Sequence, residues 1–135
     1  MAALDRTRAL IAGAAEVIGL PELRQDATGG YRLTIGGDDV LIYGGDDEYV
    51  LIEAPIGKMR VGPDYATISY LLQSNMFNSD CMPFVIALDE GGNLIQWAKL
   101  RIAEFDGTKL ATALENVAGR TAGLRGELTE APAAG

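Results

Sequence analysis

The N-terminal segment carries apolar side chains at the spacing of an amphipathic helix. Asp5 can cap the start of this helix, and Gly19 followed by Pro21 is a stop signal. The apolar positions form one broad face of small and aliphatic side chains: Leu10, Ile11, Ala14, Ala15, Val17 and Ile18. The pattern predicts a helix that ends near Ile18 and packs this face on a sheet, or leaves part of it open for a partner.

Three short strands separated by glycine-rich turns are predicted next. Apolar and polar residues alternate over 31–35, as in a half-buried strand, and segments 40–43 and 49–54 are expected to pair beside it. The tetrapeptide Gly-Gly-Asp-Asp lies between them twice, at 36–39 and 44–47, where glycine and aspartate suit tight turns. The pattern therefore predicts an antiparallel meander. Irregular connectors are expected on either side of it, over 22–30 and 55–63.

A second helix and a hairpin follow the meander. Asp64 can cap the helix, while the run Phe84–Leu88, the turn Asp89–Asn93 and a strand reaching Ile102 form the hairpin. The helix carries apolar side chains at i, i+3, i+4 and i+8, preceded by one aromatic residue: Tyr65, Ile68, Leu71, Leu72 and Met76. This apolar arc is wider than one contact with a sheet requires. Trp97 lies on a strand face that mixes apolar and basic side chains, which favours an interface or a rim.

A last helix is predicted from Asp106 or Thr108, either of which can cap it. Its apolar positions recur at alternating spacings of four and three: Leu110, Leu114, Val117, Thr121, Leu124 and Leu128. This stripe is too short for a coiled coil, so it is expected to pack on the sheet. The order of elements, α-β-β-β-α-β-β-α, predicts an α+β fold with an antiparallel sheet and three helices. We expect one domain over residues 1–129 and a flexible tail over residues 130–135.

The chain is acidic, with 19 Asp and Glu residues against 11 Lys and Arg residues and a net charge of −8. Nucleic-acid-binding proteins need basic surfaces that neutralise phosphates, so the charge argues against that class. An acidic surface favours basic or polar partners instead. The N-terminus lacks the apolar core of a signal peptide, and no apolar run approaches the roughly 20 residues of a membrane span. The cytoplasm is therefore the expected location.

Residues suited to catalysis or metal binding are scarce. The chain has no histidine, which removes the commonest general base and most zinc sites. Cys81 is the only cysteine, and the acids near it disfavour the thiolate that a nucleophile needs. The two Gly-Gly-Asp-Asp turns match neither an EF-hand loop nor the nine-residue calcium repeat. We therefore expect no enzymatic activity, no metal and no cofactor.

Two motifs in the central part of the chain resemble a known family. The run LLQSNMF, a polar break and the run FVIALDEGGNLIQWAKL are similar to the helix–strand–strand core of class I type III secretion chaperones, the Tir-chaperone (CesT-like) family. The positions that carry the resemblance are Leu71, Leu72, Asn75, Phe77, Leu88 and Asp89. The chain departs from the family at Asp80-Cys81-Met82-Pro83, where small residues are usual.

The resemblance implies a homodimeric chaperone. It would bind the N-terminal region of one or more secreted effectors in extended form and deliver it to the secretion ATPase, without using ATP itself. Effector contacts are expected on the first helix and the meander, at Leu10, Ile11, Ala14, Leu33, Ile35, Leu41 and Tyr43. The dimer interface is expected on the central helix and the hairpin, at Tyr65, Ile68, Leu71, Leu72, Met76 and Trp97.

Two other interpretations stay open from the residues alone. A regulatory or immunity-type module could bind protein through the same α+β fold. The third interpretation is a small-molecule-binding or enzymatic domain with an internal pocket, and the missing histidine and cofactor motifs argue against it.

Overall fold

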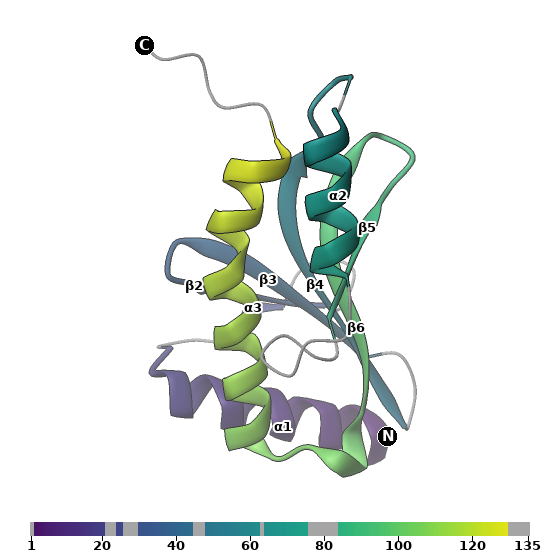
Figure 1. Ribbon diagram of the computed structural model, residues 1–135. Helices are drawn as coiled ribbons and strands as arrows, with labels where there is room; N and C mark the ends of the chain where they lie inside the picture. Colours follow the sequence, from purple (N-terminus) through teal and green to yellow (C-terminus); the bar gives the residue numbers. More distant parts are fainter. Residues whose placement is uncertain are drawn as a thin grey trace.

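The computed structural model describes most of the chain: residues 2–20, 24–25, 30–44, 48–62, 64–75 and 84–129. Its elements are α1 (Ala2–Ile18), β1 (Arg24–Gln25), β2 (Tyr31–Ile35), β3 (Asp38–Gly44), β4 (Tyr49–Lys58), α2 (Tyr65–Ser74), β5 (Val85–Leu88), β6 (Asn93–Arg101), the 3₁₀ helix η1 (Ile102–Glu104) and α3 (Gly107–Leu128). The described strands form one antiparallel sheet of six, in the order β1-β2-β3-β4-β6-β5 (Figure 1). The predicted α+β class is confirmed, as is the predicted order of the three helices and the five main strands. β1 is an addition, because it pairs with β2 from within the predicted loop 22–30.

All three α-helices lie on one side of the sheet (Figure 1). α3 runs along the sheet, α1 crosses the first turns of α3, and α2 lies beside the C-terminal half of α3. The strands turn alternate side chains toward the helices, and the buried ones in β4 and β6 are Val50, Ile52, Ala54, Ile56, Leu94, Gln96, Ala98 and Leu100. One face of the sheet is therefore core, and the other face remains accessible.

The first turn of the meander consists of two glycines. Gly36 and Gly37 have φ values of 61° and 89°, which favour glycine and give the twist that a two-residue hairpin needs. Asp38 and Asp39, which the sequence places in the turn, are instead the first residues of β3. The second predicted turn cannot be compared in the same way, since 45–47 lie outside the described residues.

β4 extends into the segment that the sequence predicts to be an irregular connector. It continues to Lys58, and its register against β6 shifts between Pro55 and Gly57, which marks a β-bulge. The φ of Gly57 is 142°, a conformation that glycine adopts readily, so the strand bends there and resumes pairing. The predicted connector is therefore wrong over 55–58.

α1 begins at Ala2, so Asp5 lies inside the helix and the predicted cap is wrong. The predicted end is confirmed, because Gly19 has a φ of 89° and its N–H donates to the Ala15 carbonyl over 2.9 Å. The buried face of the helix consists of Thr7, Leu10, Ile11, Ala14 and Ala15. Val17, which was predicted to share this face, is more than half exposed because it lies at the margin of the buried arc.

α3 follows the prediction closely. Asp106 caps it by accepting a hydrogen bond from the Lys109 N–H over 2.8 Å, and all six side chains of the predicted stripe are buried. Thr121, the polar member of that stripe, is paired with Gln96 on β6. The Gln96 amide donates to the Thr121 hydroxyl over 3.0 Å and to the Val117 carbonyl over 3.2 Å. These two bonds fix the position of α3 on the sheet.

α1 and α3 approach each other closely where two glycines meet. A Cβ atom on Gly107 would lie 2.9 Å from the carbonyl carbon of Gly13, which is closer than packed chains allow. A Cβ atom on Gly119, also in α3, would have no neighbour within 4 Å.

We expect Gly107→Ala to destabilise the fold by about 1–3 kcal/mol, because the added methyl group must push α1 away from α3. Gly119→Ala is the matched control and should be neutral or stabilising by up to about 1 kcal/mol, since alanine is the better helix former. Urea unfolding followed by circular dichroism measures both changes. Equal free energies of unfolding for the two variants would contradict the close approach.

Candidate functional site

The accessible face of the sheet carries a row of partly exposed side chains across four strands. Leu41 on β3 pairs with Glu53 on β4, Glu53 pairs with Trp97 on β6, and Trp97 pairs with Val85 on β5. Trp97 is 40% exposed although it is large and apolar, and Val85 and Leu51 on the same face are exposed to a similar degree. This apolar surface is available to a partner.

Basic side chains lie beside Trp97 on the same face. The Lys99 ammonium lies 4.4 Å from the centre of the Tyr49 ring, and Arg101 donates a hydrogen bond to the Tyr49 hydroxyl over 3.3 Å. The predicted mixture of apolar and basic side chains on this strand face is therefore confirmed.

α2 carries a second exposed apolar surface. Asp64 caps the helix as predicted, since its carboxylate accepts from the Thr67 N–H over 2.8 Å. Thr67 is buried and Leu71 packs on a small core cluster, so this side of the helix faces the rest of the fold. Tyr65 and Leu72 lie on the other side and are 87% and 63% exposed.

The residues predicted for a dimer interface fall into three groups. Four are exposed: Tyr65, Ile68, Leu72 and Trp97. Leu71 is partly buried against the cluster that contains Ile86. It differs in this from the exposed Leu72, because consecutive side chains of a helix point about 100° apart. Met76 lies outside the described residues. Val85 was missed, and its place opposite Trp97 in the hairpin is the signal that could have identified it.

Four of the seven residues predicted to contact an effector belong to the core: Leu10, Ile11, Ala14 and Leu33. Their spacing reflects the packing of α1 and β2 against α3, so their side chains do not reach the surface of this chain. The other three are partly buried. Ile35 lies on the helix side of β2, whereas Leu41 and Tyr43 lie on the accessible face of β3. Effector binding by these residues stays a prediction.

The β2 side of the sheet ends in a very short strand. β1 pairs Arg24 with Arg32 and Gln25 with Tyr31, so within the described part of the chain it covers two of the five residues of β2. An extended peptide can add to a sheet edge where the outer strand has main-chain groups open to it.

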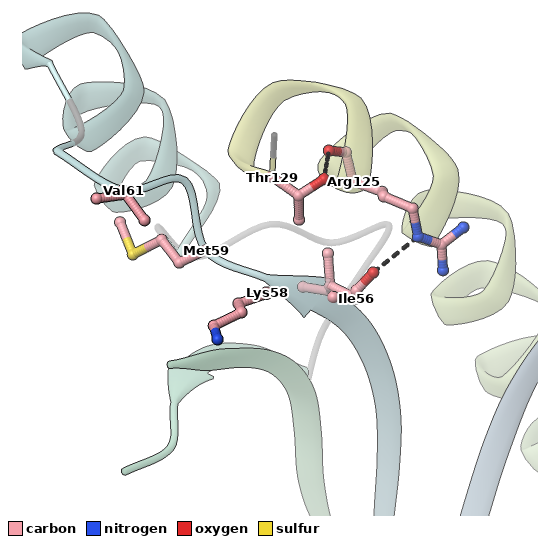
Figure 2. A pocket seen from close by; sticks show the side chains of 7 residues that line it. Ile56, Lys58, Met59, Val61, Arg125 and Thr129 are labelled. Atoms are coloured by element: carbon pink, nitrogen blue, oxygen red, sulfur yellow. Dashed lines mark hydrogen bonds between the residues drawn. The ribbon is translucent and has the colours of Figure 1, made fainter. Parts of the chain in front are cut away.

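A small pocket lies where β4 ends beside the last turn of α3 (Figure 2). It has a volume of about 230 Å³, and Ile56, Met59 and Val61 supply apolar walls. Arg125 reaches across to β4, where its Nε donates to the Ile56 carbonyl over 2.7 Å. No carboxylate or cysteine lines the pocket, so it suits an apolar side chain better than a reaction.

The described residues contain no group of three or more His, Cys, Asp or Glu side chains that could hold a metal ion. Among the described helices, none is long and apolar enough to cross a membrane. Cys81 lies outside the part of the chain that the structure describes. The described surface offers exposed apolar side chains and a sheet edge, two features through which proteins recognise one another.

Comparison with known proteins decides the family. The model of the Tir chaperone protein (CesT) family matches residues 9–125, which is most of the chain. The chain belongs to this family. The resemblance carried by the two central motifs is thereby confirmed. No curated protein matches the chain.

Solved structures similar to this CesT-family chain include two complexes of type III secretion and a chaperone–effector complex. A chain of the Yersinia pestis type III secretion chaperone SycH in complex with a stable fragment of YscM2 gives a TM-score of 0.68 at 22% identity, covering 85% of this chain and 96% of that one. A chain of the heterodimeric ExoU–SpcU complex from the Pseudomonas aeruginosa type III secretion system gives 0.70 at 23% identity, covering 88% and 97%. A chain of the HopA1–SchA chaperone–effector complex gives 0.72 at 13% identity, covering 93% and 98%. These similarities confirm the fold.

The cap of α2 predicts a specific acid dependence. The Thr67 N–H donates to the Asp64 carboxylate and holds the pKa of Asp64 below its ordinary value of 3.8. Ionised Asp64 therefore stabilises the fold above pH 3.8, and this contribution is lost as the pH falls through the lowered pKa. Asp64→Asn can still cap α2 but does not titrate. Its thermal midpoint should fall less steeply than that of the wild type as the pH drops below 3.8.

The control for this measurement is Glu115→Gln, which removes an exposed carboxylate from α3. Its thermal midpoint should follow the wild-type curve. Parallel curves for wild type and Asp64→Asn would contradict the stabilising role of the ionised cap.

Proposed function

We propose that this chain is a type III secretion chaperone that binds the N-terminal chaperone-binding region of one or more effectors in extended form. Bound in this way, the effector stays soluble and competent for secretion. The observation that carries the proposal is the match to the CesT family model, which covers both the β2–β4 meander and the β5–β6 hairpin. Chaperone–effector complexes such as HopA1–SchA are among the structures with this fold, which supports the same assignment.

The β1–β2 edge is the part of the sheet that best suits an extended effector segment. A peptide that adds to a sheet edge gains main-chain hydrogen bonds, and pockets for alternate side chains give it specificity. Ile35, Leu41 and Tyr43 lie on the two faces of the adjoining hairpin and offer partly exposed apolar contacts. The net charge of −8 favours a basic or polar effector segment and keeps the complex soluble.

A second copy of the chain is the partner that we assign to the apolar surfaces of α2 and the β5–β6 hairpin. Tyr65, Ile68, Leu72, Val85 and Trp97 are all exposed there. Exposed apolar side chains that gather on a surface mark sites of protein–protein contact. A stable dimer buries about 1,200–2,000 Å² in total. Both surfaces lie at the same margin of the sheet, since the end of α2 is hydrogen-bonded to β5.

The chaperone acts by binding alone, in the bacterial cytoplasm, and passes the effector to the secretion ATPase. Holding and releasing an unfolded segment requires no reaction of the chaperone itself. The membership in a family of chaperones supports this assignment.

The dimer is tested by Leu72→Asp. Light scattering on the wild type should give twice the chain mass of 14.3 kDa, and the variant should give a monomer, because a buried unpaired carboxylate opposes association. Gln73→Asp places the same charge on the next, exposed position of α2 and should leave the dimer intact. A monomeric wild type at micromolar concentration would contradict the assignment.

Effector binding is tested with the N-terminal region of an effector first identified by co-purification with this chain. Leu41→Asp and Tyr43→Asp should each weaken binding at least about tenfold, because they place a charge on the apolar contact surface. Ala122→Asp, which places the same charge at an exposed position of α3, should bind like the wild type. Titration calorimetry measures the Kd of each folded variant.

Ile11→Asp separates a core role from a binding role. Ile11 is completely buried, so we expect this variant to unfold rather than to bind weakly. An Ile11→Asp variant that stays folded but no longer binds the effector would show that α1 belongs to the binding surface. If Leu41→Asp and Tyr43→Asp both fold and bind with wild-type affinity, the meander is not part of that surface.

A further inference from the structure

Among the described residues, the outer edge of β5 is paired with a side chain. Asn75 follows the last turn of α2, and its amide nitrogen donates to the Ile86 carbonyl over 3.0 Å. Its amide oxygen accepts a hydrogen bond from the Ile86 N–H over 2.6 Å. One side chain therefore supplies the donor and the acceptor that a neighbouring strand would supply.

Because of the position of Ile86 in β5, this pairing blocks the addition of another strand. β5 has four residues and is the last of the described strands in the sheet, with β6 on its other side. In an antiparallel ladder, alternate residues direct both main-chain groups toward one neighbour. Ile86 directs both of its groups to Asn75, so the outward-facing positions of β5 are Ile86 and Leu88. A strand that added to this edge would need Ile86, and Asn75 already occupies it.

We propose that Asn75 closes the β5 edge to strand addition, leaving the β1–β2 edge as the one at which the sheet accepts an extended peptide. The closure itself is independent of the proposed function. Its consequence for effector binding rests on that function, because it makes Asn75 a residue that determines which edge the effector uses.

An open β5 edge would be hazardous for this chain. Val85 and Leu88 are apolar and exposed, so unpaired main-chain groups between them would favour aggregation by strand pairing. Natural sheets protect such edges from pairing with other chains. At the opposite edge, the described part of β1 is only two residues long.

The test uses the purified chain without any effector and compares wild type, Asn75→Ala and the neighbouring control Gln73→Ala. Amide hydrogen exchange by NMR should show Ile86 protected in the wild type and in Gln73→Ala. In Asn75→Ala, the Ile86 amide should exchange at least about tenfold faster, because it loses its acceptor, while Ile52 in the buried strand β4 keeps its rate. Sedimentation velocity should show that Asn75→Ala forms larger, concentration-dependent species beyond the wild-type oligomer.

Asn75→Asp is the second variant, and it carries the test if Asn75→Ala does not fold. It keeps an acceptor for the Ile86 N–H but has no donor for the carbonyl, so it should associate more than the wild type. Equal exchange at Ile86 in wild type and Asn75→Ala would overturn the proposal, and so would an Asn75→Asp variant that associates no more than the wild type. Faster exchange at Ile86 in Asn75→Ala without additional association would overturn it as well, since the β5 edge would then be open and still not pair with another chain. Failure of effector binding changes none of these readouts, so the two proposals can fail separately.

Discussion

The packing of α3 along one face of the sheet is the interaction on which the remaining structure depends. The buried stripe of this 22-residue helix meets the inward side chains of the central strands, and α1 crosses its first turns at a contact between two glycines. At the other end, α2 joins the same layer through a smaller cluster: Ile56, Leu71, Ile86, Leu94, Leu124 and Leu128. Because the helices cover one face only, the other face and the outer side of α2 stay available for binding.

A buried polar residue fixes this arrangement. Gln96 is fully buried, and a buried amide is costly unless it is hydrogen-bonded. The bonds that its Nε2 donates to Val117 and Thr121 hold β6 and α3 in one register, since a shift of the helix would leave this nitrogen without its acceptors. Side chains alternate along a strand, so the inward position of Gln96 also turns Trp97 to the accessible face. The core thereby determines which residues the binding surface displays.

The sequence predicts those parts of the fold that follow from periodicity and from local caps. The stripe of α3, the alternation in β2 and β6 and the caps at Asp64 and Asp106 depend on neighbours in the chain, and all of them are confirmed. The β-bulge at Gly57 was missed because a proline and a glycine together are more typical of a connector than of a strand.

The binding surface was harder to predict for a physical reason. Apolar spacing identifies a face but does not say what covers it. Ile11 and Leu33 have the pattern of a contact surface and are core, whereas Leu71 and Leu72 are adjacent, identical and differently exposed. Asn75 belongs to the motif that carries the family resemblance, yet its pairing with Ile86 depends on how α2 and β5 meet in space.

The central claim is that an extended effector segment binds at the β1–β2 edge and the adjoining meander. Hydrogen–deuterium exchange of the chaperone, measured with and without the N-terminal region of a co-purified effector, tests it most directly. We predict new protection in 31–35 and 38–44, with α3 and β5 unchanged. Protection confined to β5, or none anywhere in a complex that forms, would contradict the account.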